Sequence, residues 1–125
     1  AGGGIYGGSA TDCLIMSNSA TLYSGGGVYY ASVTNCTISG NSAGVDGGGL
    51  GQSTADHCSI TGNTATESGG GLYESTAQFC TISGNMAELS GGGLSKSTAI
   101  NCSISENSAV SGGRIWRGIS KYRPE

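Results

Sequence analysis

The stretch from Gly69 to Ser90 decides the fold and reads Gly-Gly-Gly-Leu-Tyr-Glu-Ser-Thr-Ala-Gln-Phe-Cys-Thr-Ile-Ser-Gly-Asn-Met-Ala-Glu-Leu-Ser. The same phrase starts again at Gly25, Gly47 and Gly91, and a degenerate copy starts at Gly2. One cysteine stands in each copy, so that successive cysteines are about 22 residues apart. A period of this length is typical of a solenoid, in which a repeat buries its apolar face only by stacking on its neighbours.

Each copy places small or branched apolar residues at fixed positions. An aliphatic residue follows the glycine triplet, and an isoleucine stands two residues after each cysteine, a spacing that puts both side chains on one face of a strand. The glycine triplets are expected at corners, where positive φ angles are needed. The pattern predicts a right-handed parallel β-helix of about 22 residues per coil, with five coils over residues 1–111. A partial sixth coil with a basic cap or tail is predicted over residues 112–125.

Composition and charge exclude several classes of protein. The chain has 25 glycines, one proline and 10% charged residues, a composition that disfavours long helices. The fixed apolar positions argue against disorder. Residues 1–113 contain seven acidic residues against Lys96 alone, so binding of nucleic acid is not expected. No stretch approaches the roughly 18 apolar residues of a membrane span.

Two polar residue types recur once in every copy. The asparagines are predicted to form an internal ladder that closes a turn, because asparagine tolerates a left-handed conformation. The cysteines are predicted to form a column of buried free thiols that fill space, and disulfide bridging between coils is the alternative. Paired ligands at metal-site spacing are absent, so neither a metal nor another cofactor is expected. These ladders comprise Cys13, Cys36, Cys58, Cys80 and Cys102, and Asn18, Asn41, Asn63, Asn85 and Asn107.

Two motifs of the repeat point to a known family. Gly69-Gly-Gly-Leu72 and Ile82-Ser-Gly-Asn85 represent the pattern Gly-Gly-small-aliphatic followed by Phe/Ile-x-x-Asn, which covers about residues 2–111. This pattern resembles the repeats of the polymorphic outer-membrane protein family. The resemblance implies a β-helical rod that is extracellular or at the cell surface, with an adhesive or structural role and no catalytic residues to carry over.

The expected function is therefore non-enzymatic, and a polysaccharide-active enzyme is the sharper alternative. Hydrolysis needs two carboxylates about 5 to 10 Å apart, but the carboxylates here are scattered over different columns. Asp56 and His57 form the only local acid-base pair, and neighbours on a strand are expected to point to opposite faces. Together with Asp12, they are the best catalytic candidates that the chain offers.

Two outward surfaces are candidates for binding. Hydroxyls flank the core isoleucines in two files, a pattern similar to the ladders of ice-binding solenoids, although cross-strand hydroxyl pairs are also common on plain β-helices. An interrupted strip of aromatic residues suits a surface glycan or a protein, or it shields the sheet. The hydroxyl files comprise Thr37, Ser39, Ser59, Thr61, Thr81, Ser83, Ser103 and Ser105, and the aromatic strip comprises Tyr6, Tyr29, Tyr73 and Trp116.

The ends of the predicted rod suggest a further partner. An uncapped solenoid exposes unpaired strand edges and should stack end to end. We therefore expect either that the segment from Arg114 to Glu125 covers one end or that copies of the chain associate head to tail.

Overall fold

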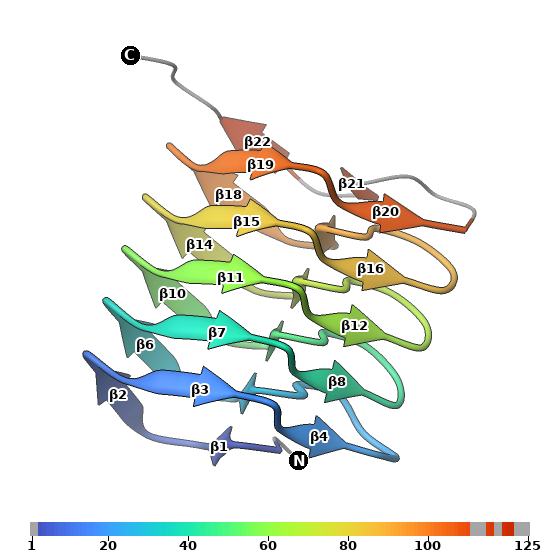
Figure 1. Ribbon diagram of the computed structural model, residues 1–125. Helices are drawn as coiled ribbons and strands as arrows, with labels where there is room; N and C mark the ends of the chain where they lie inside the picture. Colours follow the sequence, from blue (N-terminus) through green and yellow to red (C-terminus); the bar gives the residue numbers. More distant parts are fainter. Residues whose placement is uncertain (1–2, 111–114, 117–118, 122–125) are drawn as a thin grey trace.

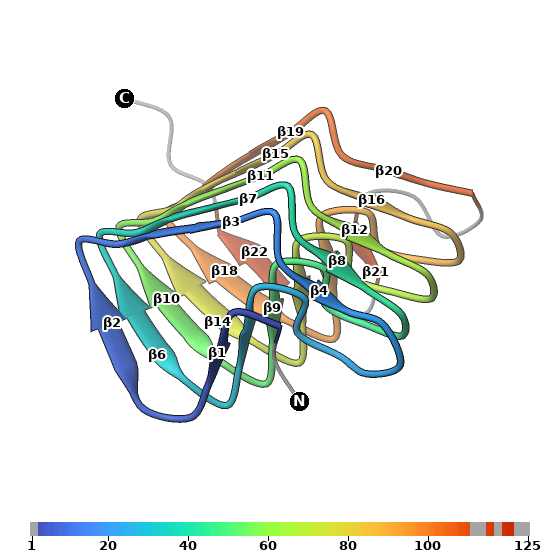
Figure 2. The same ribbon diagram turned by 60° about the horizontal axis from the view of Figure 1, so that its bottom comes forward.

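The structure is a computed structural model that describes residues 3–110, 115–116 and 119–121. Over these residues the chain is all-β without a helix, and its parallel strands stack into a solenoid of about five turns (Figure 1). Every coil contributes four strands of two or three residues, and successive coils follow the same path (Figure 2). This observation confirms the predicted parallel β-helix and its period.

Four parallel sheets run along the solenoid axis, and the first two contain six strands each. Sheet A consists of β1 (Ile5–Tyr6), β5 (Val28–Tyr29), β9 (Leu50–Gly51), β13 (Leu72–Tyr73), β17 (Leu94–Ser95) and β21 (Ile115–Trp116). Sheet B consists of β2 (Ser9–Thr11), β6 (Ser32–Thr34), β10 (Thr54–Asp56), β14 (Thr76–Gln78), β18 (Thr98–Ile100) and β22 (Ile119–Lys121).

The other two sheets contain five strands each. Sheet C consists of β3 (Leu14–Met16), β7 (Thr37–Ser39), β11 (Ser59–Thr61), β15 (Thr81–Ser83) and β19 (Ser103–Ser105). Sheet D consists of β4 (Ser19–Ala20), β8 (Ser42–Ala43), β12 (Thr64–Ala65), β16 (Met86–Ala87) and β20 (Ser108–Ala109).

The register stacks like on like and thereby builds the core. Leu50 pairs with Leu72, and Ile60 pairs with Ile82, so each aliphatic side chain covers its counterpart in the next coil. Paired residues of the first and second coils are one residue further apart in the sequence than paired residues of later coils, because one extra residue lies between Ala20 and Val28. Stacking at the strand spacing of about 4.8 Å leaves room inside for Ala, Val, Cys, Ile and Leu, which make up the hydrophobic core.

Three corners of each coil share one construction. A single residue with φ near +50° to +65° ends the strand and redirects the chain, except in the first coil, where Gly7 and Gly8 with φ of 76° and 85° form the corner between sheets A and B. These positions hold side chains such as Tyr30, His57 and Phe79, as well as Gly62 and Gly84. Left-handed conformations are costly for residues other than glycine, asparagine and aspartate, so the stacked neighbours must stabilise these corners.

The glycine triplets only partly fit the expectation of positive φ. The first glycine of a triplet, such as Gly47 or Gly69, has a φ of 68°. The second is required for a different reason, because a Cβ atom on Gly48 would lie 2.4 Å from the carbonyl oxygens of both Gly70 and Thr64. The triplet therefore combines one left-handed turn with a close approach between backbones.

The last part of the chain is described in two short segments. Strands β21 and β22 pair with β17 and β18, so the chain begins a further coil. The predicted basic cap, including most of Arg114 to Glu125, and the side chain of Trp116 lie outside the described residues. Among the residues that are described, no helix has the length and apolar character needed to cross a membrane.

Candidate functional site

The asparagines form a closed hydrogen-bonded ladder at the corner between sheets C and D. The backbone N–H and the side-chain Nδ2 of Asn41 both donate to Oδ1 of Asn63, at 3.0 Å each. Nδ2 of Asn41 also donates to the carbonyl of Ile15 at 2.9 Å. Because the same bonds recur from Asn18 to Asn107, these amides are used by the fold and offer little to a ligand.

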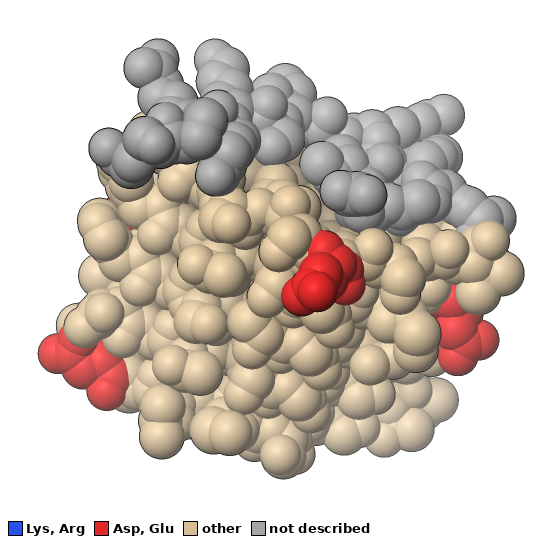
Figure 3. Space-filling model, turned by 45° about the horizontal axis from the view of Figure 1, so that its top comes forward, with Lys and Arg blue, Asp and Glu red and all other residues tan. Residues whose placement is uncertain are grey.

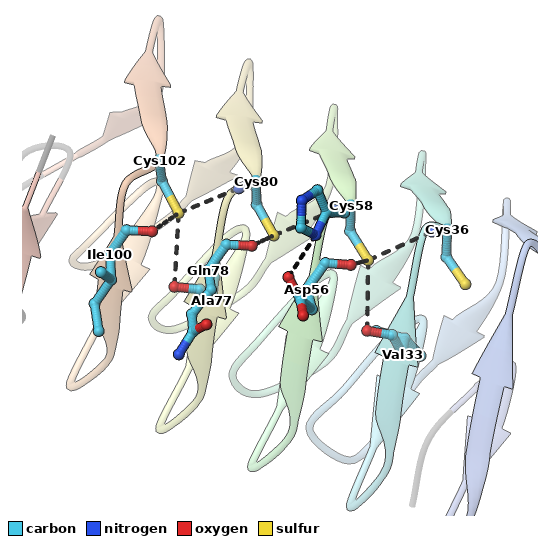
Figure 4. A network of polar contacts seen from close by, with 10 residues as sticks. Val33, Cys36, Asp56, Cys58, Ala77, Gln78, Cys80, Ile100 and Cys102 are labelled. Carbon is cyan, nitrogen blue, oxygen red and sulfur yellow. Dashed lines mark hydrogen bonds and ion pairs between the residues drawn. The ribbon is translucent and has the colours of Figure 1, made fainter. Parts of the chain in front are cut away.

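The cysteines form a second ladder, at the corner between sheets B and C. The backbone N–H of Cys58 lies 3.4 Å from the sulfur of Cys80, and the thiol of Cys58 lies 3.4 Å from the carbonyl of Asp56 (Figure 4). The backbone N–H of Cys36 likewise donates to the sulfur of Cys58, and that of Cys80 donates to the sulfur of Cys102, whose thiol donates to the carbonyl of Ile100. All five cysteines are free thiols, so no disulfide joins the coils. The thiols therefore do more than fill space, because they accept backbone N–H groups that the sheets leave unpaired.

The first cysteine differs from the other four. Cys13 is exposed, so the expectation of a wholly buried column is wrong at this position. Burial raises the pKa of the Cys36 thiol. Hydrogen bonds with Cys102 and Cys58, together with burial, raise the pKa of Cys80. The hydrogen bond with Cys80 lowers the pKa of Cys58 to about 6 and that of Cys102 to about 7. Burial opposes this change, and each of these two sulfurs faces carbonyl oxygens that would repel a thiolate, so we assign the neutral thiol to the column.

A third ladder, which the sequence analysis missed, lies at the corner between sheets A and B. The backbone N–H of Ser53 donates to Oγ of Ser75 at 3.1 Å, and that of Ser75 donates to Oγ of Ser97 at 3.1 Å. Each hydroxyl in turn donates to a carbonyl two residues earlier. Ser53, Ser75 and Ser97 recur in three successive coils, but Gly8 and Ala31 hold this position in the first two, so the signal is weaker than that of the cysteines. Serine in a hydrophilic context also resembles a surface residue.

The candidate acid-base pair is closer than expected. Nδ1 of His57 lies 2.7 Å from Oδ1 of Asp56, although neighbours on a strand should point to opposite faces. The expectation fails because His57 follows β10 in a left-handed conformation, with a φ of 54°. Asp12 belongs to the first coil and accepts a hydrogen bond from Asn35, which lies between it and His57 in the corner column. The structure therefore brings Asp56 and His57 together but not Asp12.

Sheet C carries the hydroxyl files as predicted from their spacing. Its register places Ser59 beside Thr37 and Thr81, and Thr61 beside Ser39 and Ser83. The fourth rung, Ser103 and Ser105, continues both files. Leu14 and Met16 occupy the same positions in the first coil, and both are exposed.

The aromatic strip is a column of sheet A, and Tyr6 is the only one of its described tyrosines that is largely exposed. The register aligns Tyr6, Tyr29, Gly51, Tyr73, Ser95 and Trp116. Gly51 and Ser95 are buried, Tyr29 and Tyr73 are half-buried, and Nζ of Lys96 lies 5.7 Å from the centre of the Tyr73 ring.

A cluster of tyrosines that includes exposed rings lies at the start of the solenoid. Tyr6 stacks on Tyr29 with ring centres 5.9 Å apart, and Tyr30 packs against Tyr29 at 4.4 Å. Tyr30, which the strip predicted from sequence does not include, turns outward because it is the left-handed corner residue after β5.

Beside Tyr30 an open groove of about 590 Å³ runs along the corner between sheets A and B, and we call it the corner groove. One wall is the corner column of Tyr30, Gln52 and Glu74, and the other is the outward column of Ser32, Thr54 and Thr76. The floor is formed by Gly8 and by Ala31 and Ser53, the last two of which are buried. Successive residues of each wall come from successive coils, so the groove is parallel to the solenoid axis.

Charged side chains are sparse in the sequence, which has 10% charged residues. On the side shown in Figure 3 the acidic side chains stand apart from one another among uncharged residues. Over the residues that the structure describes, no three His, Cys, Asp or Glu side chains come close enough together to hold a metal ion.

The comparisons with known proteins agree with this architecture. A search of curated proteins and a search of solved structures each found no match. A family model described as "Periplasmic copper-binding protein (NosD)", which represents a parallel β-helix family, matches residues 1–118. Since this match spans nearly the whole sequence, the chain belongs to the NosD family.

Proposed function

We propose that this chain is a non-enzymatic, structural β-helix module that works outside the cytoplasm. The observation that carries the proposal is the triple ladder. The asparagine, cysteine and serine side chains that recur in successive coils accept hydrogen bonds from the backbone of adjacent coils, so the repeated polar groups serve the fold. The description of the family as periplasmic supports the location.

The described residues do not form a set of ligands suited to the copper named in the family description. Copper prefers thiolate, thioether and imidazole ligands. Four of the five cysteines are buried in the ladder, and His57 is paired with Asp56. Met16 and Met86 lie on different sheets, C and D. These side chains do not converge, so we assign no copper chemistry to this part of the chain.

Assays of catalysis and of metal binding test the proposal. Incubation with polygalacturonate, alginate and xylan should release no new reducing ends and no unsaturated products. Titration with Cu(I) in the presence of a competing chelator should leave the metal on the chelator while the protein is folded. Cleavage that is lost in His57→Asn, or copper retained by the folded chain, would refute the structural role.

The adhesive and self-associating functions extend the same proposal. Strands β1 to β4 each have a neighbour on only one side among the described residues, so their other edges can pair with a further strand. We expect head-to-tail association of this polypeptide that increases with concentration. Light scattering from micromolar to millimolar protein would detect it, and an unchanged monomer mass over that range would rule it out.

Ice binding is the second candidate, and the two hydroxyl files of sheet C favour it. A bulky substitution in the middle of the surface, Thr61→Tyr, should abolish inhibition of ice recrystallisation if this face binds ice. Thr54→Tyr, at an outward position of sheet B, is the matched control. Absence of inhibition by the unmodified protein would remove this candidate.

A further inference from the structure

The corner groove has the features of a carbohydrate site, and we propose that it binds a neutral oligosaccharide laid along the solenoid axis. The ring of Tyr30 supplies an apolar face at the first coils, where the apolar face of a sugar ring can pack. The centre of this ring lies 4.4 Å from that of Tyr29 and 6.3 Å from that of Tyr6, and this packing holds the ring in place before a ligand arrives. The side chain nevertheless remains 53% exposed.

The walls of the groove supply the polar groups that sugar hydroxyls need. Nε2 of Gln52 donates to Oε1 of Glu74 at 3.1 Å, which orients both side chains. The second carboxylate oxygen of Glu74 and the hydroxyl of Thr76 have no hydrogen-bond partner among the described residues. Both residues line the groove. On the opposite wall, the hydroxyl of Thr54 donates a hydrogen bond to the hydroxyl of Ser32 at 3.0 Å.

Shape and charge define the class of ligand. Because the wall residues repeat once per coil, the groove offers similar contacts at regular steps and suits a chain of repeated units better than a single compact molecule. Glu74 is the only carboxylate among the described lining residues, and no basic residue is among them. An acidic sugar would therefore meet a carboxylate without a compensating cation in the groove. A single carboxylate also favours binding over hydrolysis, which uses two.

Calorimetric titration of the whole chain with neutral and acidic oligosaccharides tests this proposal. The probes are cellohexaose, mannohexaose, chitohexaose and, as the acidic member, hexagalacturonate. At least one neutral hexasaccharide should bind, and hexagalacturonate should bind more weakly than it. Tyr30→Asn, which keeps a residue tolerated at positive φ, should weaken binding about tenfold.

Phe79→Asn is the matched control, because Phe79 is 51% exposed and has a φ of 53°, close to the 58° of Tyr30, but lies on another corner. It should leave affinity unchanged. Thr76→Val keeps a β-branched side chain and tests the groove independently, should Tyr30→Asn melt early. Absence of binding by all neutral probes, equal loss in Phe79→Asn, or full affinity in a folded Tyr30→Asn or Thr76→Val protein would overturn the proposal. None of these outcomes bears on the structural role, which rests on the ladders.

Discussion

At the scale of single residues, the three ladders solve one problem with three chemistries. At each corner the backbone N–H after the left-handed residue lacks a partner in the sheets, and a side chain of the next coil accepts it. An unpaired buried N–H would cost about 1 to 3 kcal/mol. Serine, cysteine and asparagine can all accept this bond, and their different sizes fit different corners.

The cysteine ladder predicts a specific order of stabilities. Cys58→Ala removes the acceptor that faces the N–H of Cys36, at 3.5 Å in the native chain, so it should cost about 1 to 3 kcal/mol of unfolding free energy. Cys58→Ser keeps an acceptor and a donor, as Ser53 does at its own corner, and should cost less. Urea unfolding would measure both. If Cys58→Ala lost no more unfolding free energy than Cys58→Ser, the thiols would only fill space and their hydrogen bonds would not stabilise the fold.

Asp46 predicts a pH dependence of stability. Its Oδ1 accepts the N–H of Ser68 at 2.9 Å, and burial raises the pKa of this carboxyl above its ordinary value of 3.8. The folded state therefore binds the proton more tightly than the unfolded state, and the stability contributed by that proton is lost as pH rises through the raised pKa.

Asp46→Asn keeps an oxygen acceptor for Ser68 without the charge. At pH 7 this variant should be more stable than the unmodified protein by about 0.5 kcal/mol, the size expected for a partly exposed group. The difference should vanish below the ordinary pKa of the carboxyl. Thermal unfolding between pH 3 and pH 7 would show this convergence, and a constant difference over that range would exclude the electrostatic explanation.

At the scale of elements, two glycines that look alike in the sequence should respond differently to alanine. A Cβ atom on Gly48 would lie 2.4 Å from two backbone carbonyls, so Gly48→Ala should cost several kcal/mol, above about 3, or prevent folding. Gly62 has a φ of 64° but open space, with its nearest neighbour at 3.9 Å. Gly62→Ala should therefore cost only about 1 to 2 kcal/mol of conformational strain. Chemical denaturation of both variants measures the contrast, and equal losses would contradict it.

The elements also show what the sequence could and could not reveal. The sheets were predictable because Leu50, Leu72 and Leu94 repeat at the coil period, and burial forces such columns into register. The corners were less predictable than the sheets, because His57 and Tyr30 take left-handed conformations without being glycine. Only the stacking of the coils sets the direction in which these side chains point. For the same reason the Asp56 and His57 contact and the corner groove were missed, whereas the hydroxyl files of sheet C follow from strand alternation alone.

At the scale of the whole molecule, each coil contacts only its neighbours along the axis, so stability should grow with the number of coils. The first coil illustrates this dependence. Cys13 is exposed, whereas Cys36, Cys58, Cys80 and Cys102 are buried. The same residue in the repeat is thus shielded from solvent by the neighbouring coils and not by the other residues of its own coil.

Insertion of one more coil tests this additivity. A second copy of residues 69–90, placed after Ser90, preserves the register of the later coils and adds one coil interface without adding an end. The denaturant m-value should rise by about a fifth, because it follows the surface exposed on unfolding, and the midpoint should rise with it. A shuffled copy of the same segment is the control and should form no coil, since its apolar residues no longer meet their columns. If the native and the shuffled insertions unfold alike, the coils do not stabilise one another by stacking like on like.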